Sequence, residues 1–215
     1  MKYLLASLLA TTVAFAGNAA RAESDPASGL AEPVRSAFIQ EFDNTLAPLQ
    51  YVKFCMNNRA ECDADGDQHA LPSGERAIEM LRDVNVTVNN EIAPTHKPTD
   101  PIGAHWELSP SAGDCNDYAV TKRHRLVAMG WPQSALRLAV VITGGGQGHL
   151  VLVARLADGD MVLDNLSRSV RPWNAADYEW ISMQSSANPR FWVAIGHHGE
   201  RLRANRLAMT RTAQQ

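Results

Sequence analysis

The stretch GDCNDYAVTKRHRLVAMG, from Gly113 to Gly130, decides the fold, because it reads as a helix that begins at Cys115. The residues that share a helical face with this cysteine are Ala119, Leu126 and Val127. The helix is expected to end at the Gly-Trp-Pro triplet of residues 130–132. An apolar face of this kind predicts a helix that packs against other elements of the core.

Two carboxylates, Asp114 and Asp117, flank the thiol at this helix start. Negative charge beside a thiol disfavours the thiolate, which is the form that acts as a nucleophile. The partial positive charge of a helix N-terminus acts in the opposite direction. Cys115 is therefore open to three interpretations: a reactive thiol, a structural thiol, or part of a metal site.

Downstream of the helix the apolar pattern becomes β-branched or alternating, which predicts strands. The turn-forming segments GGGQG and ADGD separate these strands. The expected strands cover residues 135–143, 148–156, 160–166 and 190–198. Helices that come first and hairpins that follow indicate an α+β fold, in which the central helix packs on an antiparallel sheet.

Two further helices are expected upstream. The first is predicted from a break at Pro48 and from the helical spacing of Val34, Phe38, Phe42 and Leu46. The second is a longer amphipathic helix, with Ser73 as its candidate N-cap and Pro94 as its stop. Its core-facing stripe consists of Ala77, Ile78, Leu81, Val84, Asn85 and Val88.

The N-terminus has the pattern of a signal peptide. Lys2 is followed by an apolar run that is too short and too rich in Ala and Thr to be a good membrane span. Small residues in Ala20-Arg21-Ala22 occupy the positions that a signal peptidase reads. We therefore expect residues 1–22 to be a signal peptide and the protein to be periplasmic, with secretion as the alternative.

The remainder of the chain fits one domain. Residues 23–33 are expected to be flexible, residues 34–196 to form the domain, and the Arg-rich residues 197–215 to be a solvated tail. The formal net charge is −3 at pH 7. That balance is not typical of proteins that bind nucleic acid or a membrane surface, so no nucleic-acid partner is expected.

The sequence contains three cysteines. Export implies an oxidising compartment, in which thiols tend to pair. Cys55 and Cys62 are close in the sequence, and a short disulfide between them is the simplest pairing. Cys115 is then the odd cysteine, which is either buried and inert or retained for its chemistry.

His149 and Asp164 are candidate partners for Cys115. A thiol nucleophile needs an imidazole to accept its proton, and a third polar group usually orients that imidazole. His149 opens one expected strand and Asp164 lies near the end of the next. If Asp158-Gly159 is the turn, the two side chains share a face but stay offset by roughly four residues, about 13 Å. The alternation of side chains supports a pair of His149 and Asp164, but a strand register with this turn does not bring the two side chains into contact.

The same motifs carry a family resemblance. GDCNDYAVTKRHRL, GHLVLVARLADGDMVLDNL and PRFW resemble the bacterial transglutaminase-like cysteine peptidases, the LapG-like periplasmic group, over most of the chain. The resemblance implies a papain-like/transglutaminase-like core and a catalytic triad of Cys115, His149 and Asp164. It also implies peptide hydrolysis through a thioacyl intermediate and a periplasmic location.

The resemblance offers an explanation for the acidic neighbours of Cys115. LapG-like members bind calcium beside the nucleophile, and the matching residues here are Asp114, Asn116 and Asp117. Asn116 departs from the family pattern, which has glutamate at this position; an amide oxygen can still bind calcium, but one charge is lost. The alternative is that Asp114 is an N-cap and Asp117 a favourable first-turn carboxylate. No organic cofactor is expected.

The resemblance further implies a protein substrate, such as a surface adhesin cleaved near paired small residues, and a membrane receptor as regulator. Two other functions stay open: acyl transfer of the transglutaminase or amidase type by the same triad, and a non-enzymatic, calcium-stabilised binding module. For the oxyanion, the backbone N–H of Cys115 is one candidate donor, and Trp106 and Asn85 are the side-chain candidates.

Overall fold

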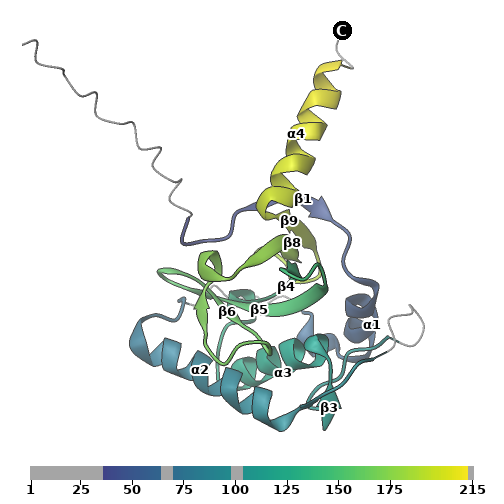
Figure 1. The fold of residues 1–215 in the computed structure, drawn as a ribbon. Helices are drawn as coiled ribbons and strands as arrows, with labels where there is room; N and C mark the ends of the chain where they lie inside the picture. Colours follow the sequence, from purple (N-terminus) through teal and green to yellow (C-terminus); the bar gives the residue numbers. More distant parts are fainter. Residues whose placement is uncertain (1–35, 64–69, 98–103, 213–215) are drawn as a thin grey trace, which may run out of the picture. The chain divides into compact units, whose positions relative to one another are not determined.

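The elements of the fold lie within residues 36–63, 70–97 and 104–212, the part of the chain that the computed structural model describes (Figure 1). The helices are α1 (Leu49–Asn57), α2 (Gly74–Glu91), α3 (Cys115–Ala128) and α4 (Gly196–Thr212), with short 3-10 helices η1 (Arg59–Glu61), η2 (Gln133–Ala135) and η3 (Trp173–Ala175). The strands are β1 (Glu41–Thr45), β2 (Ala93–Pro94), β3 (Ala112–Gly113), β4 (Leu136–Thr143), β5 (Gly148–Leu156), β6 (Gly159–Leu163), β7 (Arg171–Pro172), β8 (Tyr178–Gln184) and β9 (Trp192–Ile195).

The main sheet has seven strands in the order β1-β9-β8-β4-β5-β6-β7. Its neighbouring strands all pair antiparallel. Strands β2 and β3 form a separate parallel pair, in which Ala93 lies opposite Ala112 and Pro94 opposite Gly113. This small pair joins the end of α2 to the start of α3.

Helix α3 packs on the sheet against β5 and β4, and α2 packs beside α3 (Figure 1). The core between them contains fully buried side chains from both layers, including Leu81, Val88, Leu126, Leu138, Leu152 and Leu163. Burying one leucine side chain contributes about 1.5–3 kcal/mol to the stability of the folded state. This interface therefore fixes the position of α3 on the sheet. The predicted α+β fold, with a central helix on an antiparallel sheet, is confirmed.

The opposite face of the sheet is also buried. Its core consists of Ala139, Val141, Val151, Val153, Val162, Met183, Val193 and Ile195, together with Ile39, Ala176 and Trp180. Because both faces of the central strands are covered, their sequences read as nearly continuous apolar runs rather than as strict alternation. Strand β5 therefore carries consecutive buried residues from His149 to Ala154.

The β5–β6 hairpin has a different turn from the one that the sequence analysis assumed. Leu156 pairs with Gly159, so the turn consists of Ala157 and Asp158 rather than Asp158 and Gly159. This register moves the end of β6 by two residues along β5. Asp164 therefore comes closer to His149, while both side chains stay on the same face of the sheet, as the alternation requires.

The helix expected across Phe38, Phe42 and Leu46 is wrong. Residues 41–45 form β1, which pairs antiparallel with β9 at the edge of the sheet. Leu46, which would have faced the core of a helix, is 91% exposed. The pairing of β1 in the sheet therefore outweighs the helical spacing of these residues. Pro48 does not end a helix but directly precedes α1, where a backbone N–H would have no partner within the helix and its absence costs nothing.

Strand β8 and helix α4 are among the elements that were not expected from the sequence. Strand β8 pairs with both β4 and β9, so it lies in the middle of the sheet. Residues 197–212 of the expected solvated tail belong to helix α4, which begins at Gly196 and packs against β1, β8 and β9. Gly199 in its first turn contacts Phe42 so closely that an added Cβ would lie 2.5 Å from the ring. Residues 201–205 are exposed, and they include the apolar Leu202.

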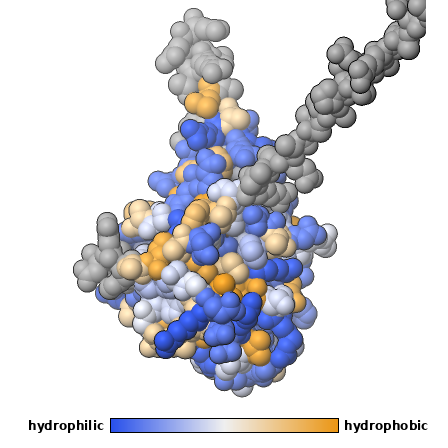
Figure 2. All heavy atoms as spheres, turned by 90° about the vertical axis from the view of Figure 1, so that its left-hand side faces the viewer, coloured by the Kyte–Doolittle hydropathy of each residue, from blue (hydrophilic) through white to orange (hydrophobic). Residues whose placement is uncertain are grey.

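The expected partners Cys55 and Cys62 are joined by a disulfide that links α1 to the residue after η1. The expected signal peptide and the flexible segment 23–33 lie outside the described residues. Within the described part of the chain, no helix combines the length and the apolar character needed to cross a membrane. The surface seen in Figure 2 is mainly hydrophilic, with hydrophobic residues scattered among polar ones.

Candidate active site

Helix α3 begins with a capping box. Asp114 Oδ1 accepts a hydrogen bond from the backbone N–H of Asn116 (3.0 Å), and Asp117 Oδ2 accepts one from the backbone N–H of Asp114 (2.9 Å). These bonds satisfy N–H groups that a helix start leaves without partners. A Cβ on Gly113 would lie 2.6 Å from Asp117 Oδ2, so only glycine leaves room for this carboxylate. The box fixes Cys115 as the first residue of the helix.

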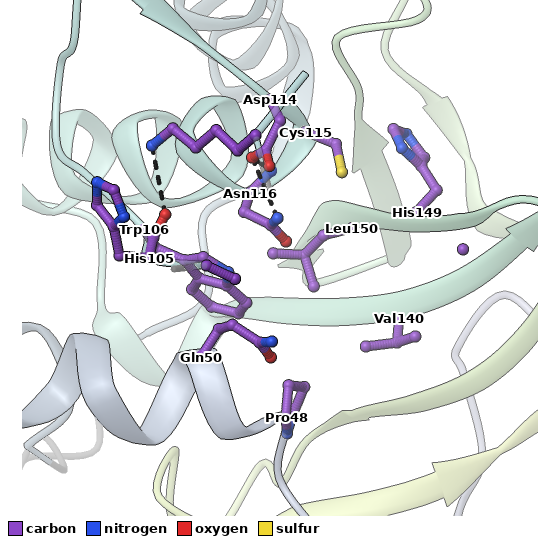
Figure 3. A pocket seen from close by; sticks show the side chains of 13 residues that line it. Pro48, Gln50, His105, Trp106, Asp114, Cys115, Asn116, Val140, His149 and Leu150 are labelled. Carbon is purple, nitrogen blue, oxygen red and sulfur yellow. Dashed lines mark hydrogen bonds between the residues drawn. The ribbon is translucent and has the colours of Figure 1, made fainter. Parts of the chain in front are cut away.

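Cys115 and His149 come from different layers and point into the same space (Figure 3). Cys115 is half-buried at the start of α3, and His149 is 8% exposed near the start of β5. The Nε2 atom of His149 is 2.8 Å from Oδ1 of Asp164, which directly follows β6 and is buried. The structure thus brings together the cysteine, the histidine and the aspartate that the sequence analysis selected.

Asp164 is held by contacts from α2 and β8. Its backbone N–H donates to Asn85 Oδ1 (3.0 Å), and its carbonyl accepts from Asn89 Nδ2 (3.0 Å). The Tyr178 hydroxyl donates to Oδ2, and the backbone N–H of Leu166 donates to Oδ1 (2.9 Å). These bonds fix the carboxylate so that Oδ1 faces His149 while Oδ2 faces Tyr178.

The two members of the His149–Asp164 pair shift each other's pKa. Burial alone would raise the pKa of Asp164, but hydrogen bonds from His149, Tyr178 and Leu166 lower it below its usual range. Burial alone would lower the pKa of His149, but its hydrogen bonds to Asp164 and Cys115 and their negative charges raise it to about 9. Since burial and the carboxylate raise the pKa of Tyr178, its hydroxyl stays protonated and remains a donor.

The raised pKa of His149 leads to a prediction for NMR titration. The imidazole signals of His149 are expected to titrate at about pH 9, compared with about 6.5 for a free histidine. Asp164→Asn is expected to lower this midpoint because it removes a negative hydrogen-bond acceptor, and Cys115→Ser is expected to lower it by less. A wild-type midpoint close to 6.5 would contradict this electrostatic arrangement.

A second buried cation lies close to this pair. Lys122 is on α3, seven residues after Cys115 and on the same helical face, and it is 1% exposed. Burial lowers the pKa of Lys122 to about 7, although the negative charge of Asp164 opposes this shift. Its ammonium lies 5.8 Å from the centre of the Tyr118 ring. Lys122 therefore changes its charge near neutral pH and interacts electrostatically with Asp164.

A cavity of about 380 Å³ opens beside Cys115 and His149. Its apolar wall consists of Ala104 and of four residues labelled in Figure 3: Pro48, Trp106, Val140 and Leu150. Its polar lining includes Gln50, Lys97, His105, Asp114 and Asn116. The Sγ atom of Cys115 is therefore accessible to a ligand, which a structural core thiol would not be.

A family model described as bacterial transglutaminase-like cysteine proteinase (BTLCP) matches residues 41–200 of this chain. The chain belongs to this family. It is therefore a transglutaminase-like cysteine peptidase. The matched region begins at β1 and ends within α4, so it includes the whole main sheet and the site described above.

Three solved structures similar to this cysteine proteinase are forms of Legionella pneumophila LapG. One is 26% identical with a TM-score of 0.43, covering 54% of this chain and 66% of LapG, just under two thirds. A calcium-bound form is 26% identical with a TM-score of 0.45, covering 57% and 71%, respectively. An EGTA-treated form is 25% identical with a TM-score of 0.45, covering 61% and 79%. A search of curated proteins finds no match.

Several residues around the site of this proteinase were not found from the sequence. Tyr178 and Asn89 hold Asp164, but no motif marks them. Asn85 was considered as an oxyanion donor; instead it is buried on α2 and binds the backbone of Asp164 and of Ser167. A buried amide in an apolar helical stripe was the available signal, since a buried polar group needs partners. Trp106, the other candidate, does line the cavity.

Three other described histidines bond carboxylates other than Asp164. His124 bonds Glu61, and His197 bonds Glu200 on α4. His105 lines the cavity, but its Nε2 atom bonds Glu107 (3.0 Å). His69 lies outside the described residues. Among the described histidines named here, His149 is the one that bonds Asp164.

The side chains expected to bind calcium do not form a set that fits the ion. Both carboxylate oxygens of Asp117 accept bonds from N–H groups or from Lys97. Asn116 Nδ2 donates to Asp114 Oδ1 (3.1 Å), so its amide nitrogen faces the neighbouring carboxylate. Calcium needs six to eight oxygen ligands. The calcium prediction therefore rests on the family resemblance and not on the arrangement of these residues.

Proposed function

We propose that this chain is an exported cysteine endopeptidase in which Cys115, His149 and Asp164 form the catalytic triad. The observation that carries the proposal is the 2.8 Å bond from His149 Nε2 to Asp164 Oδ1, beside an accessible thiol at a helix start. A cysteine proteinase needs a nucleophile, a base and a group that orients the base. These three side chains have positions that suit those roles.

Acylation begins when His149 holds the proton of the Cys115 thiol, so that the thiolate is stabilised by the imidazolium and by the N-terminus of α3. The sulfur attacks the carbonyl carbon of a peptide bond, and the carbonyl oxygen becomes an oxyanion. The backbone N–H of Cys115, at the helix start, can donate to this oxygen. His149 then gives its proton to the leaving amine, the C–N bond breaks, and a thioacyl intermediate remains.

Deacylation uses the same residues with water as the nucleophile. His149 takes a proton from water, whose oxygen attacks the thioester carbonyl, and the C–S bond breaks. The acid product leaves, and the thiolate–imidazolium pair is restored. Asp164 keeps the ring of His149 in one orientation through both steps and stabilises its positive charge.

The proposed substrate is a protein outside the cytoplasm, with a surface adhesin as the specific candidate and a membrane receptor as the regulator. The signal-peptide pattern of residues 1–22 supports a periplasmic location. The apolar wall formed by Pro48, Val140 and Leu150 supports the binding of an extended segment with small or apolar side chains.

Alkylation with iodoacetamide tests the proposed nucleophile without a substrate. Cys55 and Cys62 are in the disulfide, so Cys115 is the free thiol that reacts. We expect mass mapping to show that Cys115 at about pH 6 reacts faster than a free thiol, whose ordinary pKa is about 8.5. A rate no faster than that of a free cysteine would refute the proposed nucleophile.

Co-expression with a large surface adhesin tests the proposed substrate. The wild-type enzyme is expected to shorten the adhesin, and Cys115→Ser is expected to leave it intact. Continued cleavage by Cys115→Ser would refute the role of this residue. An intact adhesin alongside rapid alkylation of Cys115 would instead refute the proposed substrate.

A further inference from the structure

The start of α3 has an internal cation. Lys97 Nζ is 2.9 Å from Oδ1 of Asp117, 3.3 Å from Oε2 of Glu107 and 3.3 Å from the carbonyl oxygen of His105. An ammonium group has three N–H donors, and here each has an oxygen acceptor. The Lys97 side chain is 11% exposed and that of Asp117 is 0% exposed, so solvent weakens this ion pair little.

The backbone brings Lys97 to this position. Pro94 pairs with Gly113 in the β2–β3 ladder, and the N–H of Thr95 donates to the carbonyl of Gly113 (2.9 Å). The segment that carries Lys97 is therefore tied to the residues just before α3. Lys97 links three stretches of chain: the end of β2, the 105–107 loop and the first turn of the nucleophile helix.

We propose that the Lys97 ammonium takes the place of a calcium ion beside the nucleophile, so that this peptidase holds its Cys115 loop in the active arrangement without metal. The inference rests on the proposed function, because the loop matters for catalysis only if Cys115 is the nucleophile. Lys97 acts through Asp117 and the capping box, so it is a positioning residue.

The charges and the hydrogen-bond donors around Asp117 support an ammonium group rather than a calcium ion at this position. Asn116 is neutral, so the carboxylates at the start of α3 are those of Asp114 and Asp117, and the single charge of an ammonium group offsets part of their charge. Asp117 Oδ1 already receives Lys97 and the backbone N–H of Glu107 (2.8 Å), and Oδ2 receives the backbone N–H of Asp114. A divalent cation at Asp117 would have to displace the ammonium and would then meet these N–H donors.

Thermal unfolding with and without calcium tests the proposal on the wild-type protein. The midpoint and the alkylation rate of Cys115 are expected to be the same in millimolar calcium chloride and in EGTA. If calcium bound the folded protein, a free calcium concentration a hundredfold above the Kd would raise the unfolding midpoint by about 5–10 °C in a domain of this size. A rise of that size in the wild-type protein would overturn the proposal.

Lys97→Met removes the ammonium but keeps an unbranched side chain. It is expected to lower the unfolding midpoint and to slow alkylation of Cys115. Lys97→Arg, which keeps the positive charge, should give a midpoint and an alkylation rate between those of Lys97→Met and the wild-type protein. Lys53→Met, on α1 and outside the cavity lining, is the matched control and should retain the wild-type alkylation rate. A Lys97→Met variant that alkylates at the wild-type rate with an unchanged midpoint would refute the role of Lys97.

The double variant Lys97→Met/Asn116→Glu tests the exchange directly, because it removes the ammonium and adds a third acid. Its unfolding midpoint is expected to rise by several degrees on addition of calcium chloride, with recovery of alkylation. A double variant that ignores calcium would overturn the idea that Lys97 and calcium fill the same role. The unfolding midpoints do not depend on catalysis, so they decide the role of Lys97 even if Cys115 proves unreactive and the proposed function fails.

Discussion

His149→Ala is expected to slow alkylation of Cys115 by iodoacetamide by about 10- to 100-fold at pH 6. The variant removes the imidazolium that the bond to Asp164 holds in its charged form, and the thiol then behaves like an ordinary cysteine. Such a thiol is less than about 1% ionised at this pH, although a more basic thiolate is intrinsically more reactive and offsets part of the loss. Hydrolysis should fall by more, since the general acid and base are both lost.

The matched control is His197→Ala, which removes an exposed histidine on α4 that bonds only its near neighbour Glu200 among the contacts described. In this control, Cys115 is expected to be alkylated at the wild-type rate. The alkylation rates of the His149→Ala and His197→Ala variants should become equal at a pH well above the pKa of a free thiol. A His149→Ala variant that retains rapid alkylation at pH 6 would show that the helix N-terminus alone activates Cys115.

Asp160→Ala is expected to lower the free energy of unfolding by about 3–5 kcal/mol, as measured by urea denaturation followed through tryptophan fluorescence. The carboxylate of Asp160 is fully buried and accepts bonds from Arg155 (2.8 and 2.9 Å) and from the Ile39 backbone N–H (2.7 Å). It also lies 3.2 Å from the guanidinium of Arg137, which is 1% exposed. The substitution leaves the positive charge of Arg137 buried with one of its carboxylate partners removed.

Asp158→Ala is the control for this prediction, because Asp158 is exposed in the turn of the same hairpin. It should change the free energy of unfolding by no more than about 0.5 kcal/mol. Asp160→Asn keeps two polar atoms but no charge. Its loss in the free energy of unfolding is expected to lie between those of Asp158→Ala and Asp160→Ala. A loss below about 1 kcal/mol in Asp160→Ala would mean that the buried guanidinium finds water or another partner.

The helix of the nucleophile and its partner strands could be predicted because their local signals agree with the tertiary structure. Asp114 and Gly130 bracket α3, and apolar residues mark the face that packs on β5. The common face of His149 and Asp164 follows from alternation alone. Their hydrogen bond could not be predicted, because it depends on which two residues form the turn at Ala157-Asp158.

Other parts of the fold depend on contacts between residues far apart in the sequence. Strand β1 has the spacing of a helix but pairs with β9, about 150 residues later in the chain. The role of Lys97 depends on the β2–β3 ladder, whose strands are only two residues long and carry no sequence pattern. Tyr178 reaches Asp164 from β8, a strand whose place beside β4 is set by the whole sheet.

The two-residue turn between β5 and β6 makes the length of this hairpin a functional property. One additional residue would turn Asp164 toward the opposite face of the sheet if the strand slipped to absorb it, and two would carry the carboxylate away from His149. Ala157 and Asp158 are exposed, and exposed turns are the usual place for a tag or a loop graft. For protein engineering this is nevertheless a site to avoid, whereas substitutions there that keep the length should be tolerated.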